Sequence, residues 1–160
     1  FHSAWVVMND AVWLPDGERL AFRGDLLEVD KQELWVVAAD GTGLTRVNDE
    51  IRVDDADVSL WALSPDGSRF LYVVRYASYN SNLFLASADG ASVRQLTFHH
   101  LGDHFACCPL WSPDGRRYAF EAHTFGVSLN VGGLERQDTW EVGGDSRGLV
   151  WGAPGLHAAR

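Results

Sequence analysis

Three short segments of the chain repeat one motif: Trp13-Leu14-Pro15-Asp16-Gly17, Leu63-Ser64-Pro65-Asp66-Gly67 and Trp111-Ser112-Pro113-Asp114-Gly115. The steps between the three prolines are 50 and 48 residues. Proline presets the backbone for a turn, and the Asp-Gly pair that follows supplies the bend, so each segment predicts a tight turn between two strands. A basic residue and an alternating apolar run follow each turn, which is typical of a strand that leaves it.

A second feature recurs in phase with the first. Residues 34–41 match residues 83–90, and each segment ends in Asp-Gly before a further short strand. Each repeat therefore predicts four strands, and in the second repeat the last three are expected at 69–75, 82–87 and 92–97. Because no long segment has a 3.6-residue apolar period, we expect helices to be almost absent.

A four-stranded repeat of this length indicates a β-propeller blade. We expect an all-β fold in one segment, 1–160, with three blades of four antiparallel strands and a partial fourth. The blades are expected at about 10–48, 58–97 and 107–142, and a partial strand at 148–160. Aromatic side chains are expected to pack blade against blade. These residues are Trp13, Trp35, Trp61, Phe84 and Trp111.

At these residues the chain resembles the TolB-like, WD-like propellers, whose repeat carries Trp-Ser-Pro-Asp-Gly, an apolar strand, and a strand ending in Asp-Gly and Arg-x-Leu-Thr. The resemblance spans about residues 10–122 and departs in the third repeat, where 128–133 lacks the Asp-Gly turn. It implies a non-catalytic scaffold that binds a protein or a peptide, in the periplasm or outside the cell. The same repeat forms the propeller of prolyl-oligopeptidase-like hydrolases, so the alternative is the propeller domain of such an enzyme.

Three repeats and a fragment fall short of the roughly four blades that a closed ring needs. An open ring leaves apolar blade faces uncovered at both ends. We therefore expect an incomplete propeller, a fragment of a six- to eight-bladed one. The alternative is self-association of copies to close the ring, and the mass of the assembled particle separates the two.

Composition and motifs exclude several classes of function. The 13 Lys+Arg and 22 Asp+Glu give a formal net charge of −9, which argues against nucleic acid as a partner. No apolar run approaches the roughly 18 residues of a membrane span, so no membrane insertion is expected. The absence of a Gly-x-Ser-x-Gly, a phosphate-binding glycine loop and a His-Glu-x-x-His motif predicts no catalytic residues and no cofactor. Cys107 and Cys108 are too few for a disulfide scaffold or a zinc site, and we expect two reduced thiols buried at a blade edge.

The alternation of strands places the loops on two rims. The Pro-Asp-Gly and Asp-Gly turns share one rim, and the other is formed by 24–32, 49–57, 76–81, 98–106 and 123–126. Loops on this second rim are longer and more varied, so we expect binding there. The candidate binding residues are Tyr76, Tyr79, His99, His100, Asp103 and His104.

Two loops of this rim carry groups that could ligate a metal. The histidines of 99–104, with Glu121 and His123 facing the same way two positions apart on one strand, could hold zinc, nickel or manganese, as in a metal-dependent propeller lyase. The five carboxylates of 49–57 could bind calcium. Neither loop has the spacing of an established metal signature, so we expect solvated loops and no metal.

Overall fold

The computed structural model describes residues 9–26, 31–48, 56–76, 80–100, 104–134 and 139–144. Within these ranges the regular elements are all β-strands, as the sequence predicts. No helix in this part of the chain is long and apolar enough to cross a membrane.

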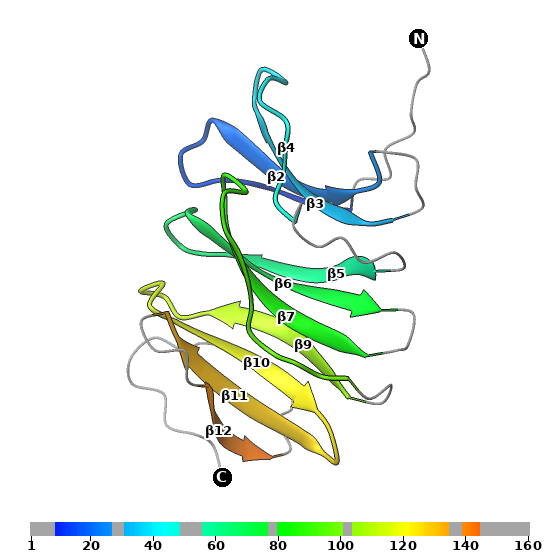
Figure 1. Ribbon diagram of the computed structural model, residues 1–160. Helices are drawn as coiled ribbons and strands as arrows, with labels where there is room; N and C mark the ends of the chain where they lie inside the picture. The colour runs from blue at the N-terminus through cyan, green and yellow to red at the C-terminus, as the bar shows by residue number, and fades with distance from the viewer. Residues whose placement is uncertain are drawn as a thin grey trace.

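The strands form three antiparallel units, which we call blades 1 to 3 (Figure 1). Blade 1 contains β1 (Asn9–Trp13), β2 (Arg19–Gly24), β3 (Glu33–Ala38) and β4 (Thr45–Arg46). Blade 2 contains β5 (Ala56–Leu63), β6 (Arg69–Tyr76), β7 (Ser81–Ser87) and β8 (Val93–Gln95). Blade 3 contains β9 (Phe105–Trp111), β10 (Arg117–His123), β11 (Val127–Gly133) and β12 (Thr139–Gly144).

The strands expected at 69–75 and 82–87 correspond to β6 and β7. The strand expected at 92–97 is shorter, because the amides of Leu96 and Thr97 both donate to the carbonyl of Leu83 and end the regular ladder after Gln95.

Blades 2 and 3 are joined into one sheet, whereas blade 1 is a sheet of its own. The junction is a single parallel pair between Ser81 at the start of β7 and Phe105 at the start of β9. The Ser81 hydroxyl also donates to the carbonyl of Ala106 at 2.7 Å, across the boundary between the blades. Blade 1 contacts blade 2 through the amide of Val58, which donates to the carbonyl of Gln32 at 2.8 Å, and through side chains, including Arg23, which donates to main-chain carbonyls of β5.

Two apolar clusters hold the blades together. The first lies between blades 1 and 2 and contains Leu34 and Val47 from blade 1 with Phe70 and Tyr72 from β6, all fully buried. The second lies between blades 2 and 3, where Leu71 of β6 is also fully buried. Residues that alternate along β6 therefore face different neighbours. This explains why residues 70–74 in the middle of β6 form an uninterrupted apolar run, because the strand is covered on both of its faces.

The predicted packing of aromatic residues between blades holds for Phe84 and Trp111, which are 5% and 6% exposed and belong to the first and second cluster. Trp35 is 7% exposed, but it pairs with Phe22 on the face of blade 1 that is turned away from blade 2, and its Nε1 donates to the carbonyl of Gly24 within blade 1. Trp111 Nε1 also donates to the carbonyl of Ala62 in the neighbouring blade at 3.1 Å. The prediction is wrong for Trp13, which is 59% exposed. Trp13 pairs with Leu20, on the face opposite to the one that packs on blade 2, and no described blade covers that face.

The turn motif makes contacts within and between blades. Within the turn of blade 2, Asp66 Oδ1 accepts hydrogen bonds from the Ser64 hydroxyl at 2.6 Å and the Ser68 amide at 3.0 Å. Gly67 has a φ of +71°, and a Cβ added there would lie 2.5 Å from Cδ of Pro15 in blade 1. The turns of blades 2 and 3 lie side by side in a similar way, since a Cβ at Gly115 would lie 3.6 Å from Cδ of Pro65. Each turn thus rests on the proline of the preceding one.

Acidification is expected to destabilise the protein between about pH 4 and pH 2. Hydrogen bonds lower the pKa of five turn carboxylates, those of Asp16, Asp40, Asp66, Asp89 and Asp114. For Asp66, the Ser64 hydroxyl and the Ser68 amide and hydroxyl lower the pKa from 3.8 to about 2. The pKa of the carboxylate is lower in the folded protein than in the unfolded protein. Its contribution to stability is therefore complete at a pH above the unfolded-state pKa, and it is lost as the pH falls through the folded-state pKa.

The measurement is the urea midpoint at a series of pH values, for the wild type and for Asp66→Asn. The Asp66→Asn protein should lose a smaller share of its stability between pH 4 and pH 2. Equal losses in the two proteins would contradict the assignment to Asp66.

Candidate functional site

One rim of the molecule, here called the loop rim, carries the connections between second and third strands and those between blades (Figure 1). The segment 96–100 is anchored to the start of β7 on this rim. Asn80 Nδ2 and Asn82 Nδ2 donate to the carbonyl of His99 at 2.9 and 3.1 Å, and Asn82 Oδ1 accepts from the His99 amide at 2.7 Å. Both asparagines are buried. The backbone around His99 is therefore fixed by side chains rather than by a strand ladder.

The histidines of the rim come partly together. The rings of His99 and His104 lie edge to face with centroids 6.3 Å apart, and His104 lies edge to face with Phe125 at 5.2 Å. Burial lowers the pKa of His99, and the charges of His104 and His100 lower it further. His99 is accordingly held towards its neutral form, whereas His100 is exposed to solvent.

Of the two tyrosines predicted to bind a partner, the structure describes only Tyr76. Tyr76 ends β6 and packs against the cluster between blades 1 and 2, where burial raises the pKa of its hydroxyl. Part of its side chain is therefore used in the fold, and a role in binding stays a prediction. Tyr79 and Asp103 lie outside the described residues.

The sequence reasoning missed two residues of this rim. Phe98 is 65% exposed and Phe125 is 97% exposed, the highest values of any large apolar side chain among the described residues. The signal that could have found them is their place in loops, because a phenylalanine outside a strand has no sheet face to cover it.

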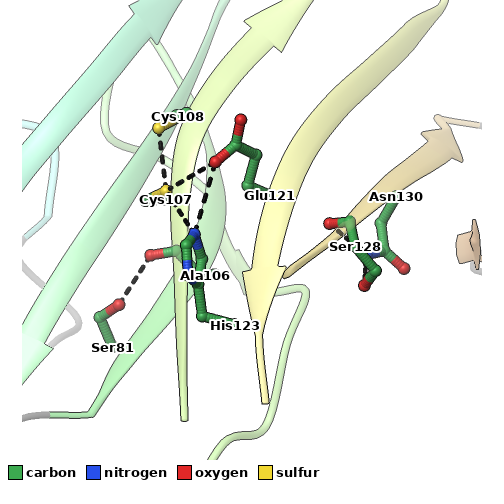
Figure 2. Close-up of polar contacts among 8 residues, drawn as sticks. All are labelled: Ser81, Ala106, Cys107, Cys108, Glu121, His123, Ser128 and Asn130. Atoms are coloured by element: carbon green, nitrogen blue, oxygen red, sulfur yellow. Dashed lines mark hydrogen bonds and ion pairs between the residues drawn. The ribbon is translucent and has the colours of Figure 1, made fainter. Parts of the chain in front are cut away.

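A second cluster lies on β9 and β10 and joins Cys107, Cys108, Glu121 and His123 (Figure 2). Cys107 Sγ lies 2.8 Å from Cys108 Sγ, 3.8 Å from Glu121 Oε2 and 3.6 Å from His123 Nε2. His123 Nε2 lies 3.4 Å from Glu121 Oε2, so these two side chains face the same way, as the sequence predicts. Both sulfurs are free thiols.

The prediction that both cysteines are buried is wrong for Cys108, which is exposed, while Cys107 is half-buried. The reason is a bulge, because the register between β9 and β10 shifts between Ala119 and Glu121. Cys108 takes a φ of +57° there, a conformation that L-residues seldom adopt. Neighbouring side chains of a regular strand point to opposite faces, so this irregularity is what brings the two sulfurs together.

The thiol of Cys107 is unsuited to nucleophilic chemistry. Burial raises its pKa, and the adjacent Cys108 thiol and Glu121 carboxylate raise it further. A thiol that stays protonated at neutral pH is a weak nucleophile.

Of the metal sites considered from the sequence, the histidine set is not assembled. His123 stacks on Phe105 with ring centroids 4.2 Å apart, on a strand separate from His99 and His104. Among the described residues, Cys107, Cys108 and Glu121 bring three ligand atoms within 4.8 Å of one another. Of the acidic loop 49–57, residues 49–55 lie outside the described residues, and Asp57 accepts a hydrogen bond from the amide of Gln32 at 2.9 Å.

Comparison with solved structures shows the fold. The chain superposes on a putative TolB from Agrobacterium tumefaciens with a TM-score of 0.61 at 16% identity, covering 90% of this chain and 51% of that one. The β-propeller domain of the Trilobed protease from Pyrococcus furiosus gives 0.60 at 13% identity, covering 88% and 44%. A nidogen/laminin complex gives 0.61 at 13% identity, covering 90% and 51%. No family model and no curated protein matches the chain.

The three structures agree on architecture. The chain has the fold of a β-propeller segment with four-stranded antiparallel blades, and this fold is the one it shares with the putative TolB. It spans about half the length, or less, of the structures that it matches.

Proposed function

We propose that the chain is a non-catalytic propeller segment that binds a protein or a peptide at the loop rim. The observation that carries this proposal is the position of Phe98 and Phe125, the two most exposed large apolar side chains among the described residues, on that one rim. Exposed aromatic side chains mark binding surfaces, because they bury a large area at a small cost in side-chain entropy.

The surroundings of the two phenylalanines suit a protein partner. The rings of His104 and Phe125 lie edge to face, and the exposed His100 is two residues after Phe98 in the sequence. Each phenylalanine therefore has a histidine near it. Protein–protein interfaces commonly combine apolar residues at their centre with polar residues around them. The formal net charge of −9 favours steering of a partner that presents basic groups. The likeness to TolB and to a nidogen/laminin complex supports the proposal.

The double replacement Phe98→Ala with Phe125→Ala is expected to weaken partner binding by more than about 100-fold, since two aromatic hot spots each contribute about 2 kcal/mol or more. The melting temperature should stay close to that of the wild type, because neither ring is buried. The assay selects peptides from a random display library on the wild-type chain and measures their affinity for each variant by calorimetry.

Trp13→Ala is the matched control, since Trp13 is an aromatic residue of similar exposure that lies on β1 and outside the rim. Selected peptides that bind the double variant as tightly as the wild type would contradict the proposal.

The second candidate is the propeller domain of a larger prolyl-oligopeptidase-like hydrolase. The likeness to the propeller domain of the Trilobed protease favours it. The gene beyond the codon for Arg160 tests it, because a Gly-x-Ser-x-Gly motif followed by an Asp and a His would supply the triad that this chain lacks.

Two further properties form part of the proposal. We place the protein in the periplasm or outside the cell, which fractionation of its source cells tests. Uncovered blade faces lead us to propose that copies associate when no further blades are present, which light scattering behind a sizing column tests.

A further inference from the structure

The bulge on β9 gathers four metal-ligating side chains of three chemical kinds, two thiols, a carboxylate and an imidazole (Figure 2). We propose that Cys107, Cys108, Glu121 and His123 form a binding site for one zinc ion. The site lies on two neighbouring strands of blade 3 and shares no residue with the loop-rim surface of Phe98 and Phe125.

The spacing of three donor atoms supports the site. In a tetrahedral zinc centre with Zn–S bonds of about 2.3 Å and Zn–N or Zn–O bonds of about 2.1 Å, neighbouring donor atoms lie about 3.4–3.8 Å apart. Cys107 Sγ, Glu121 Oε2 and His123 Nε2 form a triangle with edges of 3.8, 3.6 and 3.4 Å. These three atoms therefore already occupy one face of such a tetrahedron.

Cys108 supplies the fourth donor. Its Sγ lies 2.8 Å from Cys107 Sγ, and two thiolates on one zinc ion lie about 3.8 Å apart, so the sulfurs have to separate by about 1 Å. The ligand atoms of Cys108 and Glu121 already lie within 4.8 Å of one another, and a change of the Cys108 rotamer has to bring its sulfur towards His123 as well. Cys108 is exposed, so this movement displaces no core side chain. The bulge and the φ of +57° place adjacent cysteines on one ion, an arrangement that a regular strand forbids.

The charge and burial of Glu121 also favour a cation. Phe120 and Ala122 belong to the cluster that packs on blade 2, so Glu121 and His123 lie on the opposite face of β10. The side chains of Glu121 and His123 are 12% and 26% exposed. A carboxylate removed from water needs a compensating partner, and a divalent ion supplies it. The same ion stabilises the two thiolates that form when both thiols release their protons to solvent on zinc binding.

The donor set defines the class of ion and its role. Thiolates select zinc and other thiophilic ions such as cadmium over magnesium and calcium, which prefer oxygen ligands. Four protein ligands leave no open position for water, so the ion is structural and ties the bulge of β9 to β10.

The test uses the full chain, held reduced, with zinc and cobalt(II) as probes. We expect one zinc ion per chain by elemental analysis after gel filtration. The cobalt(II) form should show the thiolate charge-transfer band and the intense visible bands of a tetrahedral site. Cys108→Ser is the main variant, since Cys108 is exposed and its replacement preserves the core. It should lower zinc affinity by more than about 100-fold, beyond the loss found for outer-shell partners of a metal.

Glu121→Gln and His123→Asn should each weaken zinc binding, whereas the control His100→Asn should keep one ion per chain, because His100 is exposed and lies on the loop rim. Circular dichroism of each variant checks that the strands are intact. A reduced wild-type chain that retains no zinc overturns the proposal. So does full zinc occupancy in the Cys107→Ser, Cys108→Ser double variant, which would place the ion on other ligands.

Discussion

Replacing Phe70 with alanine is expected to lower the free energy of unfolding by about 4 kcal/mol, in the range found for buried phenylalanines. Phe70 is 0% exposed and belongs to the cluster shared by blades 1 and 2. Its ring lies 5.7 Å from that of Trp61, so the substitution removes the transfer free energy of the ring and leaves a cavity beneath the indole. Blade 1 has no strand pairing with blade 2, so this cluster and a few hydrogen bonds to β5 join the two blades.

The control is Phe125→Ala, which removes the same atoms from a side chain that is 97% exposed. Its unfolding free energy should stay within about 0.5 kcal/mol of the wild type. Denaturant unfolding followed by tryptophan fluorescence measures both variants. Similar losses from the two substitutions would mean that Phe70 is not part of a packed interface between the blades.

Replacing Gly132 with alanine is expected to cost about 3 kcal/mol. Gly132 on β11 pairs directly with Tyr118 on β10, and the tyrosine ring lies over the glycine backbone. A Cβ at this position would overlap the ring, with Cε2 at 2.6 Å. Tyr118 is 1% exposed and packs against Trp111 and Phe120, so the ring can move aside only by disturbing the cluster between blades 2 and 3.

Gly133→Ala provides the neighbouring control, since a Cβ there meets no atom within 4 Å. Thermal unfolding by calorimetry should show a large loss for Gly132→Ala and almost none for Gly133→Ala. In a double-mutant cycle, Tyr118→Leu should remove part of the penalty of Gly132→Ala, because the overlapping ring is gone. Strictly additive effects would show that the clash with Tyr118 is not the cause.

The blades could be predicted from the sequence because their signals are local. Pro65, Asp66 and Gly67 lie side by side in the chain, and hydrogen bonds between residues two positions apart fix the turn. The apolar run from Phe70 to Val74 likewise predicts a buried strand without knowledge of its neighbours.

The parts of the candidate site that escaped prediction depend on irregular backbone or on distant neighbours. Strand alternation places Cys107 and Cys108 on opposite faces, and only the bulge opposite Phe120 brings their sulfurs together. The exposure of Trp13 depends on whether a blade covers its face of β1, which no local pattern encodes. Glu121 and His123 could be paired from the sequence, because their spacing of two on a strand is itself a local rule.

The contact between each turn proline and the glycine of the next turn bears on how such a chain lengthens by duplication. Pro15 meets Gly67 and Pro65 meets Gly115, so the middle copy of the motif presents a proline to its successor and a glycine to its predecessor. A duplicated gene segment of one repeat carries both halves of this contact and can dock on either side without further mutation. Divergence is more constrained at Gly67, since a side chain there collides with Pro15, whereas a Cβ at Gly115 only touches Pro65. Copies that touch in this way are expected to drift as linked pairs rather than as independent units.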